Sequence, residues 1–347
     1  MSIGQRIAIE VSQLTWPQIG VCVAALYALK VFMDFVRANC DLNLFSKRKK
    51  PPLGYFSGKV VWIVGASQGL GKSLAVRWAQ DGARVILSSR RETSLMSVKL
   101  ECCRYVGEDD VAVLPFDITD SYARIKKVAE EAFAAFGHVD YIVYNAGASQ
   151  HGPVEETSHE VAEILLRMNV IGQMAVARAS LPYMLERRGG HHVVIASMAS
   201  AVPSPGQAVY AAAKSAVKAY FLSMATELSS RGIEVTVVNP GPIDVGENAQ
   251  PRMVFGKDGL MEQKNTSASS KRVSIDTVTE LVLRAVYHKV NDCWITRHPV
   301  LFMGYLMQLA PRAALVLLKK VGPGRVTQLD KGTGTGYDVA AMLQKRT

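Results

Sequence analysis

The sequence contains few cysteines and no pattern that would join them. Its five cysteines, in 347 residues, are Cys22, Cys40, Cys102, Cys103 and Cys293, and no pair has CxxC spacing. An odd number at irregular spacing is not expected of a disulfide framework or of a zinc site. We therefore predict no metal site, and we expect the adjacent Cys102 and Cys103 to be ordinary packing residues.

The sequence also lacks a recognisable nucleic-acid-binding module, although it is basic. It has 40 Lys and Arg residues against 30 Asp and Glu residues, a formal net charge of +10. Such a surface attracts phosphate groups, nucleic acid or an anionic membrane. Without a module to read nucleic acid, we favour phosphate-bearing small ligands and a membrane as partners.

No apolar run is long enough to span a membrane without a charge. The segment 16–36 is apolar, but its uncharged part from Ile19 to Leu29 is shorter than the about 20 residues that a spanning helix needs. Lys30 and Asp34 interrupt its continuation. A cleavage site typical of a removed signal peptide is missing. We predict an uncleaved signal anchor or an interfacial helix, and the alternative is an amphipathic helix packed on its own domain.

Composition divides the chain into four parts. We assign residues 1–50 to an anchor with a basic flank, 51–58 to a linker, 59–298 to one α/β domain and 299–347 to an apolar and basic extension. Pro311 breaks the extension, which forms either an interfacial hairpin or a helix that closes a ligand pocket.

The basic flank predicts on which side of the membrane the domain lies. Four consecutive cations, Lys47 to Lys50, follow the anchor. The positive-inside rule places them, and hence the domain, on the cytosolic face, and we expect the membrane to be that of the endoplasmic reticulum. Asn265 to Ser267 form a glycosylation acceptor, and a glycan there would place the domain in the lumen instead.

From Lys59 onward, short apolar runs alternate with longer helical segments. The helical segments cover 122–136, 160–187 and 209–230. Continuous apolar strands between helices predict a doubly wound parallel sheet, a Rossmann fold, with ligands at the carboxyl ends of the strands. Segment 253–274 reads as a long irregular lid. The expected strands are 59–65, 83–89, 111–117, 139–147, 191–197, 233–241 and 292–296.

A glycine-rich loop, "GASQGLGK" at 65–72, follows the first expected strand and opens a helix. Its glycines let the backbone approach a pyrophosphate, and the helix amino end directs free amides and a positive dipole toward the phosphates. The position between strand and helix gives this short motif its meaning. The expected cofactor-binding residues here are Gly65, Ser67, Gln68, Gly69, Leu70 and Gly71.

The second strand ends in "SSRRE", 88–92, where a cofactor without a 2′-phosphate usually meets an acid. Arg90 and Arg91 stand there instead, and arginine binds phosphate in bidentate fashion. We therefore expect NADP(H) rather than NAD(H). Asp117, after the third strand, is expected to bind the adenine amino group, with helix capping as its alternative role.

"YNAG" ends the fourth strand at 144–147. We expect Asn145 to hold neighbouring strands together, and Ala146 and Gly147 to keep the backbone close to a cofactor ribose.

Three further residues form a candidate catalytic group. Tyr210 and Lys214 are four residues apart in a helical run, so they share one face. An ammonium near a phenol favours the phenolate, which makes the tyrosine usable as a general acid or base. Ser197, at the end of the fifth strand, can donate a hydrogen bond to the same substrate oxygen.

Taken in order, these motifs resemble the short-chain dehydrogenase/reductase family. The resemblance covers 59–296 and is carried by "GASQGLG", "YNAG", Asn169 in "LLRMNVIG", Ser197, "YAAAK" and "NPGP". It implies that Tyr210 exchanges a proton with the substrate oxygen, that Lys214 lowers the tyrosine pKa and holds the nicotinamide ribose, and that Ser197 orients the substrate.

The resemblance implies further roles. Asn169 would anchor a water of a proton relay, although it could equally be an amide at a helix kink. Pro240, Gly241 and Ile243 would contact the cofactor. Val245 departs from the family, which often has threonine there to bond the nicotinamide amide. The resemblance also suggests a homodimer through the long helices.

We therefore expect a membrane-associated oxidoreductase that transfers hydride between NADP(H) and a lipophilic carbonyl or alcohol. A steroid, a retinoid or a long-chain ketone would suit the apolar anchor and tail. The alternatives are a nucleotide-binding scaffold without turnover and a reductase of the 3-ketosphinganine type.

Overall fold

The structure is a computed structural model, and it describes residues 15–246, 252–259, 261–264 and 272–330. The glycosylation acceptor expected at Asn265 to Ser267 lies outside the described residues, so the structure does not bear on it.

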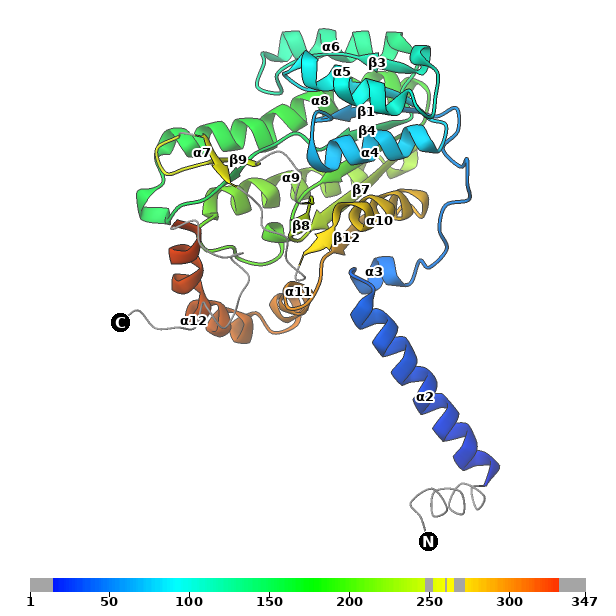
Figure 1. Ribbon diagram of the computed structural model, residues 1–347, viewed down its shortest axis with the longest axis vertical. Helices are drawn as coiled ribbons and strands as arrows, with labels where there is room; N and C mark the ends of the chain where they lie inside the picture. The colour runs from blue at the N-terminus through cyan, green and yellow to red at the C-terminus, as the bar shows by residue number, and fades with distance from the viewer. Residues whose placement is uncertain (1–14, 247–251, 260, 265–271, 331–347) are drawn as a thin grey trace.

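Seven parallel strands form one sheet in the order β12-β7-β6-β4-β1-β2-β3. This sheet lies at the centre of the molecule, with helices on both sides (Figure 1). The order reverses between β1 and β4, and in open parallel sheets the ligand crevice lies at such a switch point. The predicted doubly wound fold is confirmed. The strands are β1 (Val60–Val64), β2 (Arg84–Ser88), β3 (Val111–Val113), β4 (Tyr141–Tyr144), β6 (Gly190–Ile195), β7 (Ile233–Pro240) and β12 (Asp292–Ile295).

Helices cover both faces of this sheet and bury one apolar core on each side. One core includes Leu74, Leu95 and Val282 of helices α4, α5 and α10, and the other includes Ile125, Val176 and Phe221 of helices α6, α8 and α9. Strands covered on both faces are apolar throughout, as in β1, where all five residues are buried. The helices are α4 (Gly69–Gln80), α5 (Glu92–Cys102), α6 (Tyr122–Ala135), α8 (Gly172–Glu186), α9 (Ala208–Glu227) and α10 (Ile275–Tyr287).

The expected helix 160–187 is interrupted. Helix α7 (His159–Leu166) and α8 are joined by a π-helical turn at Arg167–Ile171. Such turns occur often at functional sites, and this one holds Asn169. The third strand is shorter than expected, because Pro115 has no N–H for the sheet and β3 ends at Val113.

The prediction of an irregular lid at 253–274 is wrong for the part of that segment that the structure describes. Strands β9 (Arg252–Phe255) and β10 (Met261–Lys264) pair antiparallel, and β9 also pairs with β5 (Ser149–Gln150) just after β4. The turn between β9 and β10 contains Asp258 and Gly259, an Asp-Gly pair typical of hairpins, with Gly259 at φ +88°. A further small sheet joins β8 (Ile243–Asp244) to β11 (Val273–Ser274).

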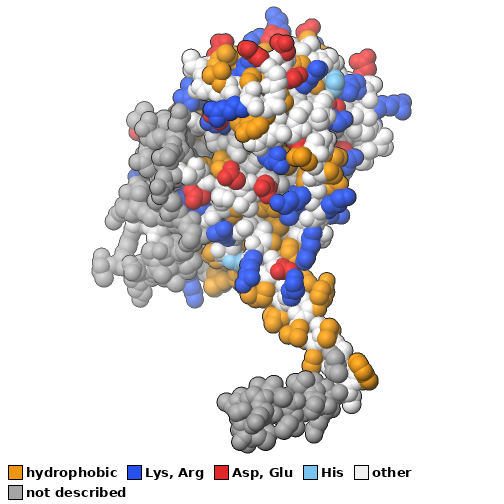
Figure 2. Space-filling view, turned by 45° about the vertical axis from the view of Figure 1, so that its right-hand side comes forward, with side chains coloured by type: hydrophobic (Ala, Val, Ile, Leu, Met, Phe, Trp, Pro, Cys, Tyr) orange, Lys and Arg blue, Asp and Glu red, His pale blue; other side chains and the backbone are white. Residues whose placement is uncertain are grey.

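Helix α2 (Trp16–Arg37) projects away from the rest of the molecule (Figure 1). The helix has 22 residues, and its most apolar 18-residue stretch has a mean hydropathy of 2.0, so by length and composition it could cross a membrane. Lys30 and Asp34 pair at 2.9 Å along the helix, so the charges that interrupt the apolar run partly neutralise each other. Figure 2 shows hydrophobic side chains along the projecting helix and Lys and Arg side chains near its junction with the body.

The inner end of α2 is fixed to the body by aromatic contacts. The ring of Phe35 lies 5.3 Å from that of Phe45, which ends the short helix α3 (Leu42–Phe45), and 6.3 Å from that of Tyr305. The backbone that follows α2 joins the edge of the sheet, where Cys40 forms an isolated antiparallel β-bridge with Ile295. Only the end of α2 therefore packs on the domain.

The C-terminal extension forms two helices, α11 (Val300–Leu309) and α12 (Pro311–Asp330). Pro311 begins α12 rather than only breaking a helix, which is favourable because the first helical residue needs no N–H partner. Helix α12 lies close to the loop that precedes α9: Leu329 approaches Gly206, and Pro205 approaches Gly322. The extension thus packs beside the start of the helix that carries Tyr210.

Candidate active site

The glycine-rich loop lies between β1 and α4, at the carboxyl end of the sheet. Gly65 has φ +96°, and its N–H donates to the Ser88 carbonyl at 2.7 Å. The Asn145 side-chain amide donates to the Gly65 carbonyl at 2.8 Å. A Cβ on Gly65 would come within 2.5 Å of the Ala146 nitrogen. The predicted Asn145 therefore does tie the loop to the end of β4, and the close approach requires glycine.

Gly71 and Gly69 differ in their surroundings. A Cβ on Gly71 would collide with the Gly65 carbonyl, whereas one on Gly69 would meet nothing within 4 Å. Gly69 has φ +54° and begins α4, whose amino end exposes backbone amides. The open space at Gly69 and the free amides fit a pyrophosphate. Beside them, Ser67 is half-buried, Gln68 is exposed and Leu70 is buried.

The two arginines predicted to select the cofactor both follow β2 and are exposed. The Nε of Arg90 lies 3.8 Å from a carboxylate oxygen of Asp117, and Arg91 donates to Gln68 at 3.4 Å. The other Asp117 oxygen accepts bonds from the backbone and hydroxyl of Thr119, at 2.9 and 2.7 Å. Asp117 thus stabilises its own turn as well as facing Arg90.

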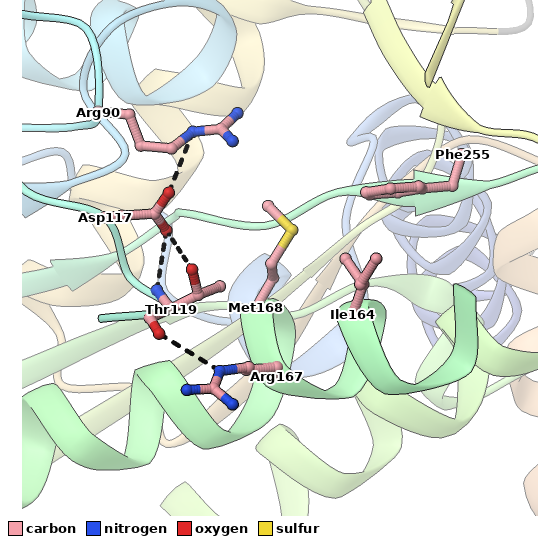
Figure 3. A pocket seen from close by; sticks show the side chains of 7 residues that line it. All are labelled: Arg90, Asp117, Thr119, Ile164, Arg167, Met168 and Phe255. Carbon is pink, nitrogen blue, oxygen red and sulfur yellow. Dashed lines mark hydrogen bonds and ion pairs between the residues drawn. The ribbon is translucent and has the colours of Figure 1, made fainter. Parts of the chain in front are cut away.

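Arg90, Asp117 and Thr119 line a cavity of about 380 Å³ (Figure 3). Its other wall is Ile164, Met168, Arg167 and Phe255, and the Arg167 Nε donates to the Thr119 carbonyl at 3.3 Å. Sequence reasoning missed these four. The i, i+4 spacing of Ile164 and Met168 marks one helix face, but no local pattern shows that Phe255 would reach it from β9.

Asn169, Gly147 and Lys214 come together at the end of β4. The Asn169 amide nitrogen donates to the carbonyls of Ala148 and Leu165, both at 3.0 Å. Its Oδ1 is buried and accepts no hydrogen bond from any described residue. A Cβ on Gly147 would strike that oxygen and would lie 3.7 Å from the Lys214 ammonium. Asn169 is therefore an amide in the π turn, and its oxygen is available to a ligand or water.

Lys214 is buried, with an exposed fraction of 5%. Its ammonium donates to the Ile195 carbonyl at 2.9 Å and lies 5.9 Å from the centroid of the Tyr210 ring. Burial lowers the lysine pKa to about 8, because the charged form loses hydration. The predicted Tyr210–Lys214 pair is present on one face of α9.

Ser197 follows β6, two residues beyond Ile195, to which Lys214 is bonded. Its hydroxyl oxygen accepts from the Ala199 N–H at 3.1 Å, which begins a short helical turn at Met198–Ser200. Because the oxygen accepts, the hydroxyl proton remains to be donated. Ser197 is half-buried.

The residues expected after the sixth strand lie where β7 ends. Pro240 is its last residue, and the Gly241 N–H donates to the Ile295 carbonyl at 2.9 Å. A Cβ on Gly241 would collide with Thr296, so the tight approach to β12 requires glycine. Ile243 pairs with Val273 in the small sheet.

Gln173 is a residue that the sequence analysis missed. Its amide nitrogen donates to the Ala146 carbonyl, and its Oε1 is buried without a partner among the described residues. It stands one helical turn after Asn169, and that i+4 spacing was the available signal.

Comparisons with known proteins agree with this geometry. The short chain dehydrogenase family model matches residues 59–252. Dehydrogenase/reductase SDR family member 7 of Mus musculus is 32% identical over 313 residues, 87% of this chain and 90% of the relative. The Homo sapiens protein of the same name is 31% identical over 322 residues, 90% of this chain and 92% of the relative.

Solved structures show the same fold. A short-chain dehydrogenase from Streptomyces avermitilis has a TM-score of 0.64 and 26% identity, covering 77% of this chain and 98% of its own. ElxO with NADP bound has a TM-score of 0.51 and 26% identity, covering 54% of this chain and 75% of its own.

The relatives confirm the resemblance seen in the motifs and support an enzyme that uses a nicotinamide cofactor and a small-molecule substrate. With a family match over more than half its length and full-length relatives above 30% identity, the chain belongs to the short-chain dehydrogenase/reductase family of NAD(P)-dependent oxidoreductases.

Proposed function

We propose that this protein is a membrane-associated, NADP(H)-dependent carbonyl reductase or alcohol dehydrogenase for lipophilic substrates. The observation that supports this chemistry is the buried Lys214. Its ammonium lies beside the ring of Tyr210 and donates a hydrogen bond to the carbonyl of Ile195, two residues before Ser197. A buried cation beside a phenol is an arrangement for proton transfer.

Tyr210 is the proton donor in reduction and the proton acceptor in oxidation. When Tyr210 gives its proton to the substrate oxygen, the Lys214 ammonium stabilises the phenolate that remains. The Ser197 hydroxyl, whose oxygen already accepts from Ala199, donates its proton to the same substrate oxygen and fixes its position.

Asn169 and Lys214 supply the route by which the phenolate is reprotonated. The Asn169 Oδ1 is buried and accepts no bond from the described residues, and it lies on the same side of Gly147 as the Lys214 ammonium. A water bound to this oxygen would connect Lys214 to solvent, because a buried polar atom without a partner favours a water with several polar contacts.

The residues at the carboxyl end of the sheet fit a dinucleotide. The open space at Gly69 and the amino end of α4 suit the pyrophosphate, Asp117 the adenine, and Gly147 the nicotinamide ribose. When bound, the nicotinamide supplies or accepts the hydride. Arg90 and Arg91 support NADP(H) over NAD(H), because two cations and no acid follow β2 before Glu92.

The membrane association and the lipophilic substrate rest on the apolar surface of the chain. Helix α2 exposes Trp16, Leu26 and Tyr27 at 86%, 67% and 68%, and α11 exposes Phe302 at 52%. Exposed apolar side chains on a projecting helix favour a membrane, and substrates that partition into lipid reach a site held there. The basic residues 47–50 support a domain on the cytosolic face. The endoplasmic reticulum is the proposed membrane. The family resemblance suggests a homodimer through the long helices α8 and α9.

The test is cofactor-dependent turnover by the full-length, membrane-bound protein. NADPH and NADH would be compared on a steroid ketone, a retinaldehyde and a long-chain aliphatic ketone, with Tyr210→Phe as the control. We expect turnover with NADPH that falls at least about 10²-fold in the variant, while NADPH binding remains. Equal turnover in the variant would remove Tyr210 from the mechanism, and preference for NADH would overturn the assigned cofactor.

A further inference from the structure

Helix α12 belongs to the extension beyond the sheet, yet one of its side chains reaches the start of the catalytic helix. Arg325 is buried, with an exposed fraction of 7%. It donates through Nη1 to the Pro205 carbonyl at 2.6 Å and through Nη2 to the side-chain oxygen of Gln207 at 2.7 Å. Gln207 is the residue immediately before α9, three positions ahead of Tyr210.

Gln207 continues the contact to the other side of the site. Its amide nitrogen donates to the Ser149 hydroxyl at 2.8 Å. Ser149 belongs to β5 and stands two residues after Gly147, where Asn169 and Lys214 meet. The three side chains therefore connect the extension, the start of the Tyr210 helix and the segment that follows β4.

Hydrogen-bond chemistry gives this chain of contacts a direction. A guanidinium only donates, so it fixes the oxygen of the Gln207 amide toward Arg325. The amide nitrogen must then point to Ser149, whose oxygen accepts. The Ser149 hydroxyl proton is consequently left to be donated to an acceptor beyond the three residues. Reversal of the Gln207 amide would place an NH₂ group against the guanidinium, which is unfavourable.

The backbone around Gln207 is built for this contact. Gly206 has φ +79°, its carbonyl accepts from the Gly152 N–H at 3.0 Å, and a Cβ there would come within 3.0 Å of Leu329 on α12. The loop is thus held between the segment after β5 and helix α12. The position of this loop therefore depends on the C-terminal extension as well as on the α/β domain.

We propose that Arg325 is a positioning residue of the active site, acting through Gln207 on Tyr210 and on the direction of the Ser149 hydroxyl. Ser149 then donates a hydrogen bond to an acceptor oxygen of the substrate at a distance from the reacting carbonyl. This inference rests on the proposed reductase activity, and it makes the C-terminal extension part of the substrate site.

The experiment uses the full chain with Arg325→Met, Gln207→Glu and Ser149→Ala, and with Arg312→Met as the matched control. Arg312 is an exposed arginine on the same helix, so its substitution removes the same charge. Gln207→Glu keeps an acceptor for Arg325 but replaces the donor to Ser149 with a carboxylate oxygen, which would accept the Ser149 proton and turn it away from the substrate. This variant therefore separates the direction of the bonds from the stability of the loop.

For the panel carbonyl with the highest turnover, we expect Gln207→Glu and Ser149→Ala to raise KM about 10-fold, the usual order for one lost hydrogen bond, with NADPH affinity unchanged. Arg325→Met should also lower kcat, because the start of the Tyr210 helix loosens. An unchanged KM in Gln207→Glu and Ser149→Ala would overturn the role of Ser149. Equal effects of Arg325→Met and Arg312→Met would overturn the role of Arg325.

A readout without substrate separates this inference from the reductase proposal. Amide hydrogen exchange of residues 203–212 should accelerate in Arg325→Met and remain unchanged in Arg312→Met and Ser149→Ala. If the wild type shows no turnover on any panel carbonyl, the reductase proposal fails while this exchange result still decides whether Arg325 holds the loop. Unchanged exchange in Arg325→Met contradicts the positioning role whatever the turnover.

Discussion

The Lys214 ammonium donates to the carbonyl of Ile195 at 2.9 Å, so α9 and the end of β6 are joined at the point where the chain turns to Ser197. One bond therefore links the helix that carries Tyr210 to the strand that leads to Ser197. Because Lys214 is buried, this bond also compensates part of the hydration that the ammonium loses.

The burial of Lys214 predicts a pH-dependent stability. Its folded pKa of about 8 is below the ordinary 10.5, so the unfolded chain binds more protons between these values, and stability rises with pH across that range. Below pH 8 the full penalty applies, on the order of 3 kcal/mol. Urea unfolding should show that the wild type gains stability relative to Lys214→Met as the pH rises from 8 to 10.5. A constant difference across this range contradicts the lowered pKa.

The two arginines after β2 predict the cofactor preference. Replacement of Arg91 by Ala should raise the KM for NADPH about 10- to 100-fold, because it removes a cation that we propose binds the 2′-phosphate, and should leave the KM for NADH unchanged. Arg90→Ala should do less, since Arg90 already faces the Asp117 carboxylate. Initial rates with both cofactors provide the measurement. Arg104→Ala, which removes an exposed arginine elsewhere, is the control.

The glycine-rich loop predicts two different outcomes for the same substitution. Gly71→Ala should destabilise the fold, on the order of 3 kcal/mol, because its Cβ would collide with the Gly65 carbonyl. Gly69→Ala should fold with a smaller loss, since its Cβ meets open space, but it should lose NADPH affinity because we propose that the pyrophosphate occupies that space. Thermal unfolding and NADPH fluorescence distinguish the two. Normal NADPH binding by Gly69→Ala would argue against the pyrophosphate position.

Much of this site could be predicted from local sequence. The loop at Gly65, the strand-end Asn145 and the i, i+4 pair Tyr210 and Lys214 are each fixed by neighbours in the chain, so a short pattern carries them. Phe255 reaches the cavity, and Arg325 reaches Gln207, through contacts between distant segments. Nothing in the local pattern around either residue encodes those contacts.

The prediction of an irregular lid at 253–274 was wrong for a different reason. The polarity of this segment indicated irregular structure, but β9 obtains its partners from β5, about one hundred residues earlier in the chain, and from β10 across a short turn. Strand pairing of this kind depends on backbone groups, which every sequence supplies. The Asp258–Gly259 turn was the one local signal of a hairpin.

Helix α2 is the proposed membrane anchor, and this proposal can be tested by substitution. Replacement of Leu26 and Leu29 by Asp should release the protein from liposomes, because each Asp in the apolar interior costs about 3 kcal/mol. Flotation of the full-length protein with liposomes is the measurement, and turnover in detergent should be unchanged. Leu100→Asp removes a similarly exposed leucine, at 70%, from α5 on the body. Flotation of the double variant at the wild-type level would exclude α2 as the anchor.

Asp41, where α2 meets the body, carries the last prediction. It is buried, with an exposed fraction of 4%, and its carboxylate accepts from the Leu44 N–H at 3.1 Å as the cap of α3. Burial raises its pKa to about 6, despite that hydrogen bond, and nearby Asp292 adds to the effect. The folded protein therefore binds more protons than the unfolded chain between pH 4 and pH 6, and this group lowers stability as the pH rises through that range.

Asp41→Asn keeps the capping oxygen and removes the charge. We expect the variant to be more stable than the wild type at pH 7, by about 1 to 3 kcal/mol, and the advantage to vanish near pH 4, where the wild-type carboxyl is protonated in the folded state. Urea unfolding at both pH values tests this. Asp41→Ala, which also loses the cap, should gain less at pH 7. If Asp41→Asn is less stable than the wild type at pH 7, the carboxylate is stabilised in place, and the junction between α2 and the body depends on its charge.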